Sequence, residues 1–212
     1  MEAKIVIMAA DGLSSLLAAL RRLGYEMVGP MVRDGAIAYD EIQSADQLPA
    51  GWTDVQDAGS YRLRRRDDAA IFGFAVGPHS WKKFLVPPTL RLWSGRRDAD
   101  GAVKLDEPAP PPQKLALIGV RSCELHAIAI QDKVLIGGRY ADPHYAAQRN
   151  NLFIVAVNCI EAGGTCFCAP MGTGPRVSDG YDLALTELIG AGVHEFVVEI
   201  GSEAGAAAIG TV

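Results

Sequence analysis

The sequence lacks a long apolar run, an excess of basic charge and any cysteine outside one 46-residue stretch. No apolar segment approaches the roughly 20 residues that a membrane-spanning helix needs. The formal net charge is −5, and no basic surface of the kind that binds nucleic acid stands out. Cysteine used only to fill the core would be scattered more widely, so the confined cysteines argue against that use. We therefore expect no membrane and no nucleic-acid partner, and the cysteines need a specific explanation.

The N-terminus carries no recognisable targeting signal. Its apolar run, residues 1–10, is too short for a secretory signal and is followed by Asp11. We therefore expect a cytoplasmic protein, in which thiols stay reduced and clustered cysteines indicate a metal more often than a disulfide. Cys166 and Cys168 are also too close in sequence to pair comfortably with each other.

The N-terminal half shows patterns of both helix and strand. Leucines at helical spacing predict a helix over 11–24, which Asp11 caps and Gly24 ends. The turn Asp34-Gly35 predicts a hairpin of strands 25–32 and 36–39. We expect a loop over 43–60, a second strand pair at 61–65 and 70–76, and a short helix within 77–85.

The C-terminal half follows a proline-rich segment and reads differently. Two apolar strands at 114–120 and 151–157 flank a helix over 124–134, which is typical of a parallel α/β unit. A helix at 182–188 and a strand at 195–200 complete the prediction, and 204–212 begins like a helix. The predicted fold class is α/β: an N-terminal α+β portion with hairpins (1–107), a linker (108–113) and a parallel or mixed sheet portion (114–212). These portions can also form one continuous domain.

The four cysteines lie where such a sheet would gather a ligand. Cys123 follows the first apolar strand at the start of a helix, where free backbone N–H groups stabilise negative charge. Cys159 follows the second strand, and the carboxyl ends of parallel strands meet at one edge of a sheet. Cys166 and Cys168 lie in a glycine-rich loop, whose flexible backbone we expect to fold both thiols onto the same point. Four thiols are the ligand count of an all-cysteine metal or iron–sulfur centre.

The spacing of these cysteines leaves the metal open. The chain has neither the two-residue-spaced pairs of zinc knuckles nor the compact bacterial ferredoxin run. Near Cys123, Glu124 and His126 are candidate supporting or substitute ligands. Arg121 would place a positive charge beside an anionic cluster or form a structural ion pair. The sequence order singles out no catalytic residue.

Several short motifs resemble one known family. They are Gly119-Val120-Arg121-Ser122-Cys123-Glu124, Asp142-Pro143-His144-Tyr145, Asn158-Cys159, Cys166-Phe167-Cys168, Gly172-Thr173-Gly174-Pro175, Tyr61-Arg62-Leu63 and Gly77-Pro78-His79-Ser80. In order and approximate spacing the chain resembles the iron–sulfur electron-transfer subunits of anaerobic sulfite reductase and of sulfhydrogenase, the latter being the NiFe hydrogenase beta subunit. Where the family has aspartate, this chain has Glu124, which retains a carboxylate oxygen.

The resemblance implies an electron-transfer subunit of an oxidoreductase, rather than a catalyst on its own. Its expected partners are a catalytic hydrogenase- or reductase-type subunit and a flavin/NAD(P)H-linked subunit. It implies one [4Fe–4S] cluster on Cys123, Cys159, Cys166 and Cys168. Relatives carry a later ferredoxin-like segment with two further clusters, and no cysteine follows Cys168 here. We therefore expect the chain to be the N-terminal part of a longer protein.

Two other functions compete with this interpretation. One is a zinc-binding or metal-free scaffold that docks partner redox subunits, with the region of Trp81 and Trp93 and the proline-rich linker as its docking surface. The other is a thiol-redox or flavin-binding domain in which Cys159 exchanges disulfides with Cys166 and Cys168.

Overall fold

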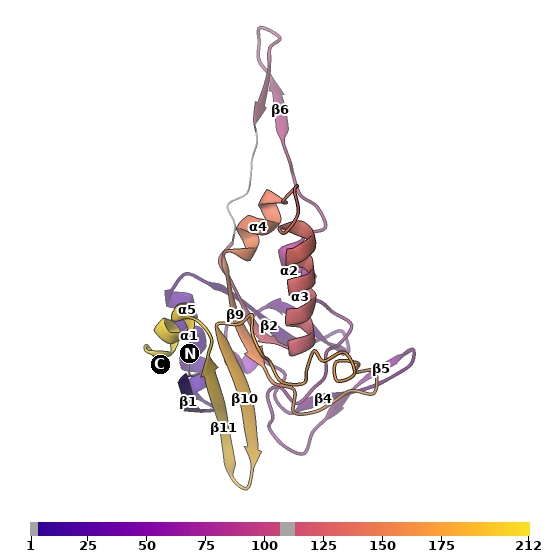
Figure 1. Ribbon diagram of the computed structural model, residues 1–212, viewed down its shortest axis with the longest axis vertical. Helices are drawn as coiled ribbons and strands as arrows, with labels where there is room; N and C mark the ends of the chain where they lie inside the picture. Colours follow the sequence, from indigo (N-terminus) through magenta and orange to yellow (C-terminus); the bar gives the residue numbers. More distant parts are fainter. Residues whose placement is uncertain (1–3, 107–112) are drawn as a thin grey trace.

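A seven-stranded mixed sheet forms the centre of the molecule (Figure 1). A computed structural model describes residues 4–106 and 113–212. The strand order is β1-β11-β10-β9-β8-β2-β3, in which β2, β8, β9 and β10 are mutually parallel and the outer pairs are antiparallel. The strands are β1 (Lys4–Ala9), β2 (Glu26–Arg33), β3 (Ala36–Glu41), β8 (Leu115–Val120), β9 (Leu152–Val157), β10 (Leu183–Gly190) and β11 (Val193–Ile200). The predicted α/β class with a mixed sheet is confirmed.

Helices cover both faces of this sheet because its central strands are apolar on both sides. Ala116 and Ile118 of β8 pack in the same cluster as the leucines of α1, whereas Leu115 and Leu117 pack with Leu125 of α3. The helices α1 (Gly12–Arg22) and α5 (Glu203–Ile209) pack together, and α2 (Lys82–Leu85), α3 (Ser122–Leu135) and α4 (Pro143–Arg149) lie against the other cluster. No helix within the described residues is long and apolar enough to cross a membrane.

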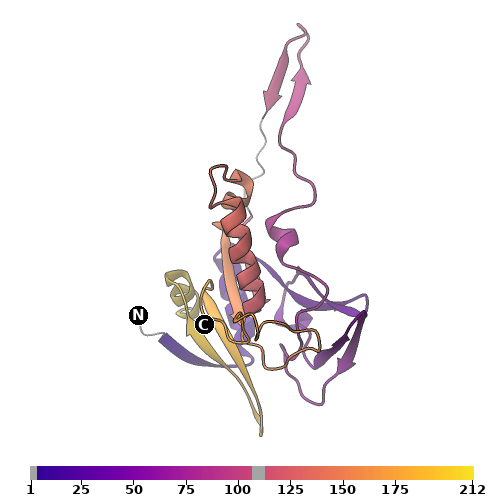
Figure 2. The same cartoon turned by 45° about the vertical axis from the view of Figure 1, so that its right-hand side comes forward.

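Two small hairpins extend from the sheet. One consists of β4 (Trp52–Asp57) and β5 (Ser60–Arg65), and the other of β6 (Ser94–Arg97) and β7 (Val103–Asp106). Figures 1 and 2 show the β6–β7 hairpin projecting as an arm from the body, at the end of α3 far from its first turn. The β4–β5 hairpin lies at the opposite end, beside the loop that joins β9 to β10.

The strands on either side of the expected linker belong to the same sheet. Strands β1–β3 precede it in sequence, and β8–β11 follow it. The division into 1–107, 108–113 and 114–212 stays a prediction. Apart from Gln113, the linker lies outside the described residues.

Elements with a strong local signal are found where the sequence predicts them. The helix expected over 11–24 is α1, and Gly24 follows it with a φ of 85°. The hairpin expected around Asp34-Gly35 is β2–β3, and both turn residues have positive φ, as a tight hairpin turn requires. The strands expected at 114–120, 151–157 and 195–200 are β8, β9 and β11, and the helix expected over 124–134 is α3.

Three predictions about secondary structure are wrong. Residues 52–57 form β4 instead of a loop, and β4 is the partner of β5. The helix expected over 182–188 is strand β10, which pairs with β9 on one side and β11 on the other. A short apolar run fits either helix or strand, and the neighbouring strands decide between them.

Residues 70–76 are the third case, because they form an irregular segment instead of a strand. Side chains bind several of their backbone groups in place of a neighbouring strand. The Glu187 carboxylate accepts the N–H groups of Ile71 (2.6 Å) and Phe72 (2.8 Å), and Asp54 Oδ1 accepts that of Ala75 (2.8 Å). This segment, residues 70–76, is called the bridging segment below.

Removing the Glu187 carboxylate should destabilise the fold. Glu187→Ala would leave two N–H groups of the bridging segment without acceptors, and the His194 ring, 2.7 Å away, would lose its partner. We expect the free energy of unfolding to fall by about 3 kcal/mol, measured by urea denaturation. Glu26→Ala, at an exposed carboxylate on β2, is the control and should change it by less than about 0.5 kcal/mol. Equal effects of the two changes would contradict this role of Glu187.

Candidate metal centre at the carboxyl edge of the sheet

Two of the cysteines directly follow neighbouring parallel strands. Strand β8 ends at Val120, and Cys123 lies in the first turn of the helix that follows it. Strand β9 pairs with β8 and ends at Val157, two residues before Cys159. The N-terminal end of a helix carries partial positive charge on its backbone N–H groups, so this end of the sheet favours negative charge.

Asn158 fixes the chain immediately before Cys159. Its backbone N–H donates to Leu185 O (2.9 Å), its Nδ2 donates to Thr186 Oγ1 (2.7 Å), and its Oδ1 accepts the N–H of Val177 (2.7 Å). Asn158 thereby joins β9 to β10 and to the segment that returns from the cysteine loop. The position of Cys159 is therefore set by both neighbouring segments.

The loop that carries Cys166 and Cys168 lies against the β4–β5 hairpin (Figure 2). Its glycines allow a close approach: a Cβ at Gly164 would lie 2.3 Å from the backbone oxygen of Gln56, and one at Gly163 would lie 2.9 Å from Ala75 Cβ. The sequence predicts that these glycines make the backbone of the loop flexible. In the structure they are needed because no side chain fits between the loop and its support.

Cys168 lies close to the first turn of α3. A Cβ placed on Gly174 would be 3.2 Å from Cys168 Sγ and 3.5 Å from Ser122 Cβ, so this glycine separates the sulfur from the helix. The Ser122 hydroxyl donates to Arg176 O (3.0 Å), and the N–H of Thr173 donates to Cys168 O (2.9 Å). These bonds hold the return segment against the helix that carries Cys123.

The thiols of Cys123 and Cys159 feel the charge of their neighbours. Burial is the main reason why the pKa of Cys123 rises to about 11, and the other three cysteines and Glu124 raise it further. Burial also raises the pKa of Cys159, an effect that the cation of Arg121 opposes. All four thiols are free, and Cys166 is the exposed one. Within the described residues, no three Cys, His, Asp or Glu side chains are arranged to hold one metal ion.

Arg121 is a buried cation between the two strand ends. Its side chain is 1% exposed, and its guanidinium donates to Phe72 O (2.7 Å), Phe74 O (3.0 Å) and Asn158 O (3.3 Å). Its Nε–H has no hydrogen-bond partner in the described part of the chain. Arg121 precedes α3, and its guanidinium therefore links the start of this helix to the bridging segment and to Asn158. The three groups that accept its hydrogen bonds are neutral backbone carbonyls.

Glu124 and His126, the other two expected supporting residues, differ in their surroundings. The Glu124 carboxylate is buried, accepts the backbone N–H of Arg121 (2.9 Å) and the hydroxyl of Tyr39 (2.9 Å), and caps the helix. Burial raises its pKa, and the hydrogen bond from Arg121 acts in the opposite direction. His126 is half-buried and lies three positions after Cys123, so the two residues share one side of α3.

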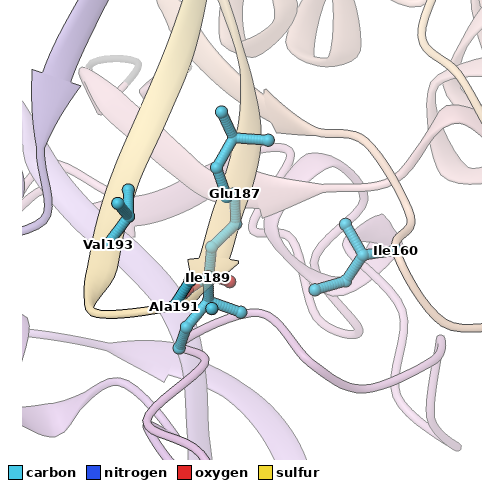
Figure 3. A pocket seen from close by; sticks show the side chains of 7 residues that line it. Ile160, Glu187, Ile189, Ala191 and Val193 are labelled. Carbon is cyan, nitrogen blue, oxygen red and sulfur yellow. The ribbon is translucent and has the colours of Figure 1, made fainter.

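An open apolar depression borders the cysteine segment (Figure 3). It has a volume of about 510 Å³ and lies between Ile160 and the end of the β10–β11 hairpin. Ile189 and Val193 of this hairpin line it. The carboxylate of Glu187 is fully buried, so the depression presents apolar walls without a reactive group. No cysteine of the described chain lines the depression, so we assign the candidate chemistry of this region to the four thiols and not to the depression.

Comparison with known proteins reveals one informative relative. The chain is 29% identical over 186 residues to sulfhydrogenase 2 subunit beta of Pyrococcus furiosus, an alignment that covers 88% of this chain and 45% of the relative. This similarity supports a sulfhydrogenase beta-like subunit family. The resemblance to the sulfhydrogenase beta subunit that the motifs predict is thereby confirmed, and the resemblance to the sulfite reductase subunit stays a prediction. The chain spans less than half the length of this relative, no protein-family model matches it, and no solved structure matches it.

The raised pKa of Cys123 predicts a pH-dependent reactivity in metal-free protein. Because alkylation requires the thiolate, Cys123 should react slowly at pH 8.5, and its rate should keep rising as the pH approaches about 11. The raised pKa also means that the folded state holds this proton more tightly than the unfolded chain. The stability due to this thiol should therefore fall as the pH rises from about 9 towards 11. Site-resolved mass spectrometry after iodoacetamide treatment measures the rate, and a Cys123 rate that levels off near pH 9 would contradict it.

Proposed function

We propose that this chain is an iron–sulfur electron-transfer domain of a hydrogenase- or reductase-type complex. Cys123, Cys159, Cys166 and Cys168 bind one [4Fe–4S] cluster in this proposal. The observation that carries it is the placement of four free thiols around one end of the sheet, beside a buried cation. The similarity to a protein named as a sulfhydrogenase subunit supports the same class of function.

A cluster and a single metal ion place different demands on the four thiols. One zinc ion binds each sulfur at about 2.3 Å and gathers four ligands into a compact tetrahedron. In a cubane cluster each cysteine binds a different iron, so the four sulfurs lie farther apart. Cys159, Cys166 and Cys168 lie near enough to Cys123 to raise its pKa, but no three Cys, His, Asp or Glu side chains of the described chain are arranged to hold one metal ion. The choice of a cluster therefore rests on the four-cysteine ligand count and on the similarity to a sulfhydrogenase subunit.

Arg121 provides the charge that such a site needs. A buried guanidinium is costly unless an anion lies nearby. The buried Glu124 carboxylate is one such anion, and a cluster bound by four thiolates would be a second. When bound, the cluster accepts and releases one electron. Arg121 holds a fixed positive charge beside it, Asn158 orients Cys159, and Ser122 holds the return segment that follows Cys168.

The partners in this proposal are those of a multi-subunit redox enzyme. A catalytic hydrogenase- or reductase-type subunit would exchange electrons with a flavin/NAD(P)H-linked subunit through the domain in the cytoplasm. The exposed Phe167, between two of the cysteines, and Met171 lie where an electron-transfer partner would cover the cluster. The buried core of a protein–protein interface is apolar, so exposed apolar side chains next to the cysteines are suited to contact a partner.

A second function, a zinc-binding or metal-free scaffold that docks partner subunits, is favoured by the β6–β7 arm. Trp93 is 63% exposed, and Val103 and Leu105 are exposed beside it, although an isolated two-stranded hairpin is only marginally stable in water. Trp81 was also expected on this surface, but it is buried and stacks on Tyr39 with ring centroids 3.9 Å apart. A docking surface would therefore centre on Trp93.

Single Cys→Ser changes test the cluster function directly. Each change at the four positions should lower the iron content of anaerobically reconstituted protein below about four per chain, and the quadruple change should abolish binding. Ser14→Ala, on an exposed part of α1, serves as the control and should retain full iron. Circular dichroism shows whether each variant is folded. Iron binding that survives the quadruple change would refute the assignment, and stoichiometric zinc in place of iron would favour the scaffold.

A further inference from the structure

The four cysteines are not equally well held. Three are half-buried, whereas Cys166 is exposed. Within its own loop, the Cys166 N–H donates to Gly163 O (3.0 Å), and the Gly163 N–H donates to Cys166 Sγ (3.2 Å). These bonds shape the turn but do not attach it to the rest of the molecule, so an outside contact has to fix the position of the sulfur.

That contact comes from Gln56 on β4. The hydroxyl of Thr165, the residue before Cys166, donates to Gln56 Oε1 (2.6 Å). The backbone oxygen of the same glutamine is the group that excludes a side chain at Gly164. One residue of the hairpin therefore meets the loop twice, once through its side chain and once through its backbone.

Gln56 is itself held in one orientation. Its Nε2 donates to Val76 O (2.8 Å) and to Asp54 Oδ2 (2.6 Å), so both amide hydrogens are used and Oε1 has to face Thr165. The other oxygen of Asp54 accepts the N–H of Ala75. The support for the loop therefore runs back to the bridging segment, whose carbonyls also bind Arg121.

A second tie holds the beginning of the loop. Arg66, which follows β5, pairs with Glu161 and also donates to Gly73 O (3.1 Å). This ion pair is five residues from Cys166 and reaches the loop near Cys159. It fixes where the loop leaves the sheet, whereas the bond from Thr165 to Gln56 is adjacent to the exposed cysteine.

We propose that Gln56 is a positioning residue that holds Cys166 in the ligand set of the cluster, a role that rests on the proposed cluster function. In this proposal, retention of the iron that Cys166 binds depends on the β4–β5 hairpin. When the hairpin no longer holds the loop, a one-electron oxidant such as ferricyanide should release that iron more readily. The step is [4Fe–4S]²⁺ → [3Fe–4S]⁺ + Fe²⁺ + e⁻, and the electron passes to ferricyanide.

Gln56→Ala and Thr165→Val remove the same hydrogen bond from opposite sides. In metal-free protein, each should speed the amide hydrogen exchange of 163–166 by roughly five-fold, the effect of losing one hydrogen bond. The double variant should add little to either single change, because both act on one contact. Thr165→Ser keeps the hydroxyl and should behave as wild type, and Val55→Ala, at an exposed residue beside Gln56, is the control.

The loaded protein supplies the second measurement. With ferricyanide, Gln56→Ala should form the [3Fe–4S] electron paramagnetic resonance signal roughly five-fold faster than wild type, and the Val55→Ala control should not. A wild-type cluster together with unchanged exchange and unchanged oxidation in both Gln56→Ala and Thr165→Val would overturn the positioning role and leave the cluster function standing. Wild-type protein that binds no iron under reconstitution would overturn both.

Discussion

The arrangement of the cysteines depends on one buried guanidinium. Arg121 lies at the junction of β8 and α3 and donates to the bridging segment and to the residue before Cys159. Three parts of the chain that are far apart in sequence therefore meet at one side chain. Carbonyl oxygens satisfy most of its donors, the buried Glu124 carboxylate lies close enough to interact with its charge, and the same charge favours the thiolate of Cys159. The proposed cluster would be a further anion beside it.

The partners of Arg121 are in turn held by two carboxylates, of which Glu187 is buried and Asp54 is half-buried. Glu187 of β10 and Asp54 of β4 accept backbone N–H groups of the bridging segment, and the carbonyl groups of the same segment accept from the guanidinium. The segment is irregular, yet carboxylates accept the N–H groups of Ala70, Ile71, Phe72 and Ala75. Such a buried polar network gains little net stability, but it specifies one arrangement because every alternative leaves polar groups unsatisfied. A site that has to place four sulfurs benefits from this specificity.

Local signals were sufficient for part of the fold and for the identity of the candidate ligands. Leucine spacing predicted α1, Asp34-Gly35 predicted a hairpin, and two apolar strands predicted where Cys123 and Cys159 would lie. Strand β10 was missed because its short apolar run gains its strand form from β9 and β11. Gln56, Asp54 and Glu187 were missed as supports because their contacts join residues up to 116 positions apart. No local pattern marks such contacts.

The most direct test of the central claim is the iron, sulfide and zinc content of protein purified without oxygen, together with its absorption spectrum. The proposed function predicts about four irons and four sulfides per chain and a broad visible absorption that bleaches on reduction. Stoichiometric zinc, or no metal after attempted cluster reconstitution, would contradict it. Either of these results would leave the scaffold, with its exposed Trp93 arm, as the better account of the chain.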